Sequence, residues 1–577
     1  MGEQGTHDER ARLERRIDQA LGREPADLAI RDTRFLNVAS GEIARGDIAI
    51  CGDRIVGTYA EYSGRREIDG RDLIVVPGFI DTHVHVESTM VTPYEFDRCV
   101  LPRGTTTAVC DPHEICNVLG RSGLEYFLEA APRLNMDLRV QLSSCVPSTH
   151  LETAGARLEA GDLVPYRDHP SVIGLAELMN FRGVFAKDPG VLDKLAAFAD
   201  AHIDGHCPLV TGRELNAYSA VGVRNCHETT NIDEAREKLR KGLQVLIREG
   251  SVSKDMDALA PLLDETTSPF IAFCTDDRNP LDIAEEGHVD WLIRAAIARG
   301  APTAMVYRAA TWSAARGFGL RDRGLVAPGY LADLVLLEDL ESCAVHMVIR
   351  RGRPVAEDGF AGHEEMARRA SLGRDSVHLA PVTVGAFRVE APGPGGPVIG
   401  VVPNAILTEH LTLALPYRDG ERLPDPGQDV AKVCVFARHG VNDNVGRGFV
   451  RGFGLPDGAL ASSVGHDSHN LCVVGMNDRD MAVAVNRLIE TGGGFVAARG
   501  GRVVADLALP IAGLMSDRPF EAVEEELRRL RAAVRDMGCP LTEPFLQLAF
   551  LPLPVIPHLK ITDHGLVDVD RFELIAA

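Results

Sequence analysis

Between Pro77 and about Gly329, short β-branched or apolar runs alternate with stretches of helical periodicity. This alternation is typical of repeated βα units whose strands pair in parallel. There are eight such runs, the number that a closed barrel needs. We therefore expect an α/β fold with a TIM-like (β/α)8 barrel whose strands lie at residues 78–84, 105–110, 138–144, 172–178, 203–205, 222–226, 244–247 and 270–274.

Both flanks of this region carry strand-like segments. They lie at residues 27–36, 46–52, 54–59 and 72–76 before it, and at 332–337 and 345–350 after it. Strands from the two flanks can join one sheet around a catalytic insert. The pattern thus predicts a composite small β domain from residues 1–76 and 330–378, around a barrel at 77–329.

The two ends of the chain differ in their residue patterns. Residues 8–22 predict a short amphipathic helix with Leu13, Ile17 and Leu21 on one face. From residue 379, Gly- and Pro-rich loops surround short strands such as 397–402 and 433–436. One helix is predicted here, at 520–537, and we interpret its apolar face as packing surface. Residues 379–577 are thus expected to form an additional C-terminal α+β domain.

Composition narrows the class of protein. The 577 residues are 45% hydrophobic and 25% charged, as in globular proteins. The formal net charge of -22 disfavours nucleic-acid partners. No run approaches the ~20 apolar residues that span a bilayer, so we expect a cytoplasmic protein without membrane contact. The 12 Cys include no C-x-x-C pair, which disfavours a disulfide framework and structural zinc sites.

The first expected barrel strand ends in His83-Val-His85. Because alternate side chains of a strand point the same way, both imidazoles can reach one metal ion. Paired His are also common without a metal. Their position at the carboxyl end of a first barrel strand favours the metal-site interpretation.

Further candidate ligands follow later strands: Glu177, His206, His227 and Asp276. Each has an ordinary alternative, as a helix cap, a core His or a turn. Together, four imidazoles and two carboxylates suffice for two divalent ions if Glu177 bridges them. This donor set suits Mn, Fe or Zn. Two such ions would supply hydroxide, and Asp276 is placed to take its proton and deliver it to a leaving nitrogen.

These motifs resemble the amidohydrolase superfamily and, within it, the bacterial adenine deaminase family. Where much of the superfamily has a carboxylated Lys on the fourth strand, this chain has Glu177. The resemblance covers nearly the whole chain beyond the first ~25 residues. It rests on segments 83–90, 104–107, 111–115, 174–180, 204–208, 226–228, 275–278, 454–455, 465–470 and 492–495.

The resemblance implies hydrolytic deamination of free adenine to hypoxanthine and ammonia, a reaction of purine salvage, at a binuclear centre. It implies one ion held by His83, His85, Glu177 and Asp276, and a second held by Glu177, His206 and His227.

The same resemblance implies a substrate side formed by Asp111, His113 and Glu114. Attack at C6 puts negative charge on ring nitrogen N1, which needs a nearby acid. Glu114 is our first choice for this acid, against a structural role beside Arg103 or Arg121. Arg278, His466 and His469 are further substrate-binding candidates, and a homo-oligomer is expected.

Several alternatives stay open. A related amidohydrolase acting on a cyclic imide, or a sugar-phosphate deacetylase, needs a basic group that Arg278 or Arg248 could supply. A zinc nucleoside-type deaminase needs H-x-E followed by P-C-x-x-C, and the chain has no P-C-x-x-C. A non-catalytic relative should have lost ligands, whereas this chain has all six.

Overall fold

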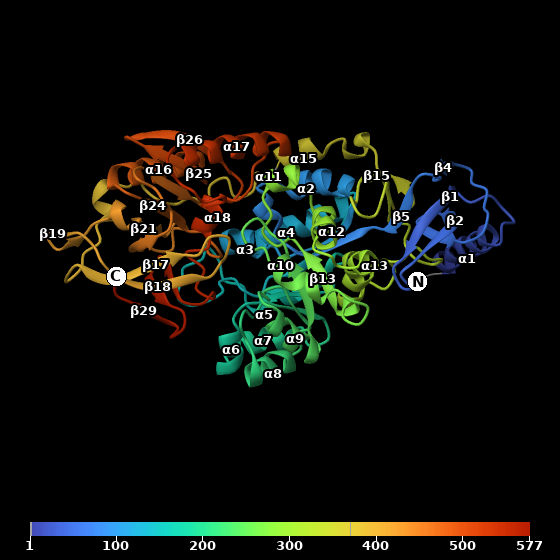
Figure 1. Ribbon diagram of the computed structural model, residues 1–577, viewed down its shortest axis with the longest axis horizontal. Coiled ribbons are helices and arrows are strands. Elements are labelled where there is room, and N and C mark those ends of the chain that lie inside the picture. Colours follow the sequence, from blue (N-terminus) through green and yellow to red (C-terminus); the bar gives the residue numbers. More distant parts are fainter. Residues whose placement is uncertain (1–2, 370) are drawn as a thin grey trace.

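A barrel of eight parallel strands occupies the middle of the molecule in the computed structural model, which describes residues 3–369 and 371–577 (Figure 1). One sheet has the order β10-β9-β8-β7-β6 and another the order β11-β12-β13. Backbone hydrogen bonds join these sheets: Arg224 N donates to Ile203 O at 3.4 Å, Asp276 N to His83 O at 3.0 Å, and His85 N to Asp276 O at 3.1 Å. The TIM-like α/β core expected from the sequence is confirmed. Its strands are β6 (Phe79–Val84), β7 (Thr105–Cys110), β8 (Asp137–Leu142), β9 (Val172–Leu178), β10 (His202–Gly205), β11 (Asn225–Cys226), β12 (Gln244–Arg248) and β13 (Ile271–Cys274).

Helices cover the outside of these strands, and amphipathic patterning explains why. In α12 (Val289–Ala298), Leu292, Ile293 and Ala296 are buried against the strands. Burying such a stripe removes apolar area from water at about 25 cal/mol per Å². Other helices around the barrel are α2 (Pro93–Val100), α4 (Arg121–Ala130), α7 (Pro189–Ala197), α8 (Gly212–Ala220), α9 (Ile232–Arg240), α11 (Pro280–Glu285) and α13 (Thr303–Arg308).

A second sheet combines strands from both flanks of the barrel, at the side of the molecule where the N-terminus lies (Figure 1). Its order is β16-β15-β14-β5-β1-β2-β3, with β4 paired to β1. α1 (Glu3–Ala20) packs beside it, yet Leu13, Ile17 and Leu21 stay exposed. The strands are β1 (Leu28–Asn37), β2 (Glu42–Cys51), β3 (Arg54–Gly57), β4 (Glu67–Asp69), β5 (Ile74–Pro77), β14 (Leu334–Leu337), β15 (Val345–Arg350) and β16 (Arg353–Pro354).

The C-terminal region lies on the opposite side of the barrel (Figure 1). Its main sheet has the order β18-β17-β22-β21-β24-β23-β25-β26. These strands are β17 (Gly395–Val401), β18 (Thr408–Ala414), β21 (Val430–Phe436), β22 (Val445–Arg451), β23 (Ala459–Ser462), β24 (Leu471–Gly475), β25 (Gly494–Arg499) and β26 (Arg502–Ala508). A smaller sheet contains β27 (Leu559–Thr562), β28 (Gly565–Asp568) and β29 (Glu573–Ile575).

The helix predicted at 520–537 is confirmed as α17 (Phe520–Asp536), which buries its apolar stripe as expected. The expectation of a single helix in this region is wrong. α16 (Asp478–Thr491) begins after Asn477, whose side chain caps it, and α18 (Pro544–Ala549) follows later. α17 also ties this region to the barrel, since Phe520 N donates to Glu95 Oε2 at 2.9 Å.

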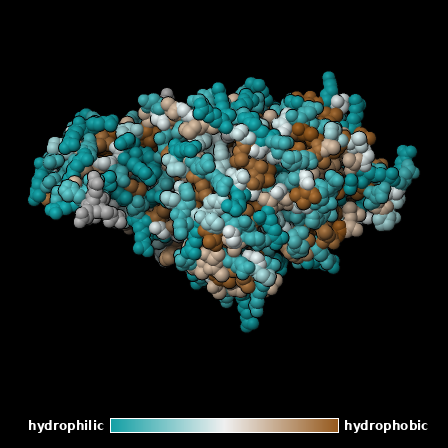
Figure 2. Space-filling view, turned by 180° about the vertical axis from the view of Figure 1, so that it is seen from behind, coloured by the Kyte–Doolittle hydropathy of each residue, from teal (hydrophilic) through white to brown (hydrophobic). Residues whose placement is uncertain are grey.

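The surface is mainly hydrophilic, with apolar residues in scattered patches (Figure 2). Among the described residues, no helix is both long and apolar enough to cross a membrane.

Candidate metal centre

His83 and His85 lie at the end of β6 with their Nε2 atoms 3.2 Å apart. His83 Nδ1 lies 2.9 Å from Asp204 Oδ2, and His85 Nδ1 lies 3.0 Å from the Asp111 carbonyl oxygen. Both partners are acceptors, so each Nδ1 carries a proton, and in the neutral imidazole each Nε2 presents a lone pair. The two rings are thus fixed with their lone pairs converging.

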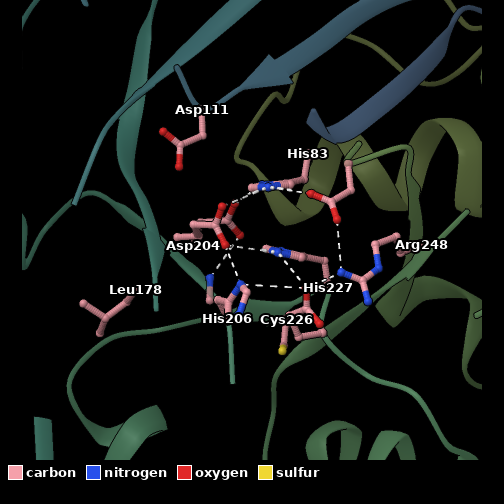
Figure 3. Close-up of polar contacts among 12 residues, drawn as sticks. His83, Asp111, Leu178, Asp204, His206, Cys226, His227 and Arg248 are labelled. Carbon is pink, nitrogen blue, oxygen red and sulfur yellow. Dashed lines mark hydrogen bonds and ion pairs between the residues drawn. The ribbon is translucent and has the colours of Figure 1, made fainter. Parts of the chain in front are cut away.

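Glu177, at the end of β9, divides its two oxygens between two groups of imidazoles. Oε1 lies 3.4 Å from His83 Nε2 and 3.3 Å from His85 Nε2. Oε2 lies 2.6 Å from His206 Nδ1 and 3.2 Å from His227 Nε2. Burial alone would raise the pKa of Glu177, but the imidazoles of His227 and His206 hold it well below its usual value. The side chain is therefore an anion placed between two groups of imidazoles. Figure 3 shows the rings of His83, His206 and His227 close together, with Arg248 beside them.

Asp276 follows β13 in a left-handed backbone conformation, with φ of 54°. Its Oδ1 lies 3.2 Å from His85 Nε2, while Oδ2 accepts a hydrogen bond from Arg248 Nη1 at 3.0 Å. Burial would raise the pKa of Asp276, but His85 and Arg248 hold it well below its usual value. One oxygen is thus fixed by Arg248, and the other faces the imidazoles.

The donor set fits a bound cation. The Nε2 atoms of His83 and His85 lie 3.2 Å apart, and each lies 3.2–3.6 Å from Glu177 Oε1 and Asp276 Oδ1. When both imidazoles are neutral, with their Nδ1 protons directed outward, no hydrogen lies among these four atoms to relieve their repulsion. A divalent ion would relieve it, and nitrogen and carboxylate oxygen are suitable ligands. His206 and His227 with Glu177 Oε2 form the second group that could hold an ion.

Asp111, His113 and Glu114 lie at and before the start of α3 (His113–Leu119). His113 Nδ1 lies 2.9 Å from Asp111 Oδ2 and 3.4 Å from Glu177 Oε1, so it borders the metal-binding candidates. Glu114 accepts a hydrogen bond from Ser88 Oγ at 3.1 Å. Burial, and then the negative charge of Asp277, raise the pKa of Glu114 well above its usual value.

The C-terminal region reaches this centre through its 465–470 loop. His466 lines the cavity at the centre, and its Nδ1 lies 3.3 Å from Glu114 Oε1. Glu114 is not among the residues that line the cavity, and it is connected to the cavity by its contact with His466. His469 is buried behind, with Nδ1 3.2 Å from Gly465 N, and it supports the turn of the loop.

The structure does not bring Arg278 to the cavity. Its guanidinium donates to Gly287 O at 2.9 Å and pairs with Glu286 Oε2 at 2.6 Å. Arg278 therefore holds the chain after β13, although sequence reasoning placed it at the substrate.

Sequence reasoning also missed part of the cavity. Asp467 and Asp277 line it beside residues that the sequence singled out. Their positions next to His466 and Asp276 were the available signal. Apolar side chains close the rest. Met179 lies within segment 174–180, whereas no local motif marks Ile406, Phe550 and Leu553.

The amidohydrolase family matches residues 74–355, and the adenine deaminase C-terminal domain matches residues 405–573. The fold and the site thus define a metal-dependent amidohydrolase. An adenine deaminase of Methylobacterium nodulans is 63% identical over 98% of this chain and 100% of that protein. Another, of Gluconobacter oxydans, is 63% identical over 96% of this chain and 98% of that protein. Adenine deaminase 1 of Rhizobium meliloti is 58% identical over 98% of this chain and 99% of its own length. The chain belongs to the adenine deaminase family.

Proposed function

We propose that this chain hydrolyses free adenine to hypoxanthine and ammonia, as a step of purine salvage. Water adds at C6 of the ring and the 6-amino group leaves as ammonia. Adenine is a flat, uncharged base, so its pocket needs apolar surface, a few polar groups and no strong counter-charge.

One observation carries the choice of an uncharged substrate. Among the described residues lining the cavity, Arg248 is the one Arg, and there is no Lys. Arg248 is already matched by three carboxylates: it pairs with Glu228, lies 3.2 Å from Asp255 Oδ2 and lies 3.0 Å from Asp276 Oδ2. A substrate phosphate or carboxylate would therefore find no free cation there, which disfavours the imide hydrolase and the sugar-phosphate deacetylase.

We assign His83, His85, Glu177 and Asp276 to one divalent ion, and Glu177, His206 and His227 to a second. Mn or Fe is our first expectation for both, with Zn as a further option. Two such ions, when bound, supply hydroxide at neutral pH by lowering the pKa of water.

Asp276 is the proposed base of the reaction. Arg248 fixes its Oδ2, so Oδ1, which faces the other assigned ligands, is the oxygen that would take a proton from water and pass it to the leaving nitrogen. Since Asp276 follows β13 within the barrel framework, its position does not depend on a mobile loop.

Glu114 is the proposed acid for ring nitrogen N1. Burial raises its pKa, which favours the protonated carboxyl that a proton donor requires. His466, in the C-terminal loop that lines the cavity, lies 3.3 Å from Glu114, and it can carry this proton to the cavity. Asp111 orients His113, which we place on the same side of the substrate.

The test is a substrate panel with purified, Mn-loaded enzyme. We expect adenine to give equal amounts of hypoxanthine and ammonia, with dihydroorotate and N-acetylglucosamine 6-phosphate unchanged. Turnover of either anion at a rate above that of adenine would refute the proposal.

A further inference from the structure

The cavity has an apolar side supplied by the C-terminal region. Ile406, Phe550 and Leu553, which we call the cover, line it together with the ligand candidates and are buried. They form one apolar cluster with Met179 of the barrel. The ring of Phe550 stacks on His466 at 4.7 Å between centroids and 11° between planes. The cover therefore packs directly against the 465–470 loop, whose His466 contacts Glu114.

One buried ammonium holds two members of the cover. Lys560, on β27, is fully buried, and its Nζ donates to Ile406 O at 2.8 Å and to Phe550 O at 3.0 Å. Within residues 3–369 and 371–577, no carboxylate pairs with this ammonium, and burial lowers the pKa of Lys560 to about 7.

An unpaired buried ammonium is costly, and an apolar residue at this position would avoid that cost. The hydrogen bonds are what Lys560 adds. They connect the 404–407 segment to the end of α18, two parts of the chain far apart in sequence. Gln547 Nε2 reinforces the connection by donating to Ala405 O at 2.9 Å.

The orientation of adenine follows from the chemistry of the proposed function, on which this inference rests. C6 must face Asp276 and N1 must face the Glu114 side. The five-membered ring carries N9 on the part of the base away from C6 and N1, and we place it against the apolar side of the cavity.

We propose that Lys560 is a positioning residue that fixes the cover, and that the cover restricts the centre to adenines without an N9 substituent. The ribose of a nucleoside, or even an N9 methyl group, meets Ile406 or Leu553. Free adenine avoids this contact because its N9 carries at most a hydrogen.

The first experiment removes side-chain volume from the cover in the full-length, Mn-loaded enzyme. For Ile406→Ala and Leu553→Ala, we expect kcat/KM for 9-methyladenine relative to adenine to rise by about tenfold or more, the range for one or a few methylene groups in an apolar pocket. An unchanged ratio in both variants, each folded and binding metal, overturns the specificity claim.

The second experiment tests whether Lys560 holds the cover in place. Lys560→Met should raise the same ratio. It should also raise the KM for adenine by a larger factor than it lowers kcat. Lys560→Arg can still donate to both carbonyls, so it should behave more like the wild type. Amide hydrogen exchange should increase in residues 404–408 and 549–556. The matched control is Lys432→Met, because buried Lys432 is paired instead with Glu421 and Asp478, both at 2.8 Å. This control should leave the ratio and both segments unchanged.

The outcomes separate the two proposals. Unchanged ratio and exchange in Lys560→Met, with adenine turnover intact in the wild type, refute this inference alone. Absence of adenine turnover in the wild-type enzyme refutes both.

Discussion

The carboxyl of Glu114 lies 3.3 Å from Nδ1 of His466, so the barrel and the C-terminal region meet in one contact at the edge of the cavity. Ser88 joins the same contact, since its hydroxyl also lies 2.5 Å from Asp277 Oδ1. The acid side of the centre is therefore assembled from both parts of the chain, and it depends on how they pack.

Glu114→Gln should separate acid catalysis from metal binding. The amide keeps the shape of the side chain but cannot donate the acidic proton, and Glu114 is not among the assigned ligands. We expect kcat for adenine to fall by ~10²–10⁴-fold with metal content unchanged. Steady-state kinetics and elemental analysis of one preparation measure both. A near-normal kcat across the pH range would transfer the role to Asp111, His113 or His466.

His83→Ala should remove at least one equivalent of bound metal and nearly all turnover, because His83 is one of the two His assigned to one ion. The control is His346→Ala, since His346 is exposed on β15, away from the centre. It should keep its metal. If His83→Ala retained full metal occupancy and normal activity, the ligand assignment would be wrong.

Asp276→Asn should keep the hydrogen bond to Arg248 feasible through its side-chain oxygen but remove the base. We expect kcat to fall by ~10²-fold or more, and metal content to fall modestly. Asp193→Asn, on the exposed face of α7, is the control and should behave as the wild type. Equal kcat in the two variants would contradict the proposed role of Asp276.

Lys560 should make stability depend on pH in a defined direction. Burial lowers its pKa to about 7 in the folded chain, from 10.5 in the absence of burial. Between these values the unfolded state binds more protons, so the contribution of Lys560 to the free energy of unfolding rises with pH. The melting temperature of the wild type relative to Lys560→Met should thus increase from pH 7 to 10.5. A difference that is flat or decreases would contradict this.

The barrel could be predicted from local pattern because each of its strands is a short apolar run between helices. The runs at 105–110 and 172–178 coincide with β7 and β9. The run at 222–226 is shortened to β11, because Gly222 adopts a φ of 108° that turns the chain before the strand begins. The six ligand candidates could be predicted together because they follow the ends of strands, and the carboxyl ends of parallel strands meet at one rim of the barrel.

The apolar side of the cavity and the true environment of Arg278 were not predictable in this way. Ile406 and Phe550 reach the cavity only because the C-terminal region packs on the barrel, and that contact leaves no periodic signal in sequence. Arg278 follows Asp276 closely, yet the turn after β13 directs its guanidinium to Gly287 and Glu286.

The most direct test of the central claim is to titrate metal-depleted enzyme with Mn²⁺ while following hypoxanthine and ammonia formed from adenine. The account predicts negligible conversion without metal and a rate that rises until about two equivalents are bound per chain, with equal yields of the two products. Full activity in the metal-free enzyme, saturation at one equivalent, or metal-loaded enzyme that forms no hypoxanthine would contradict it.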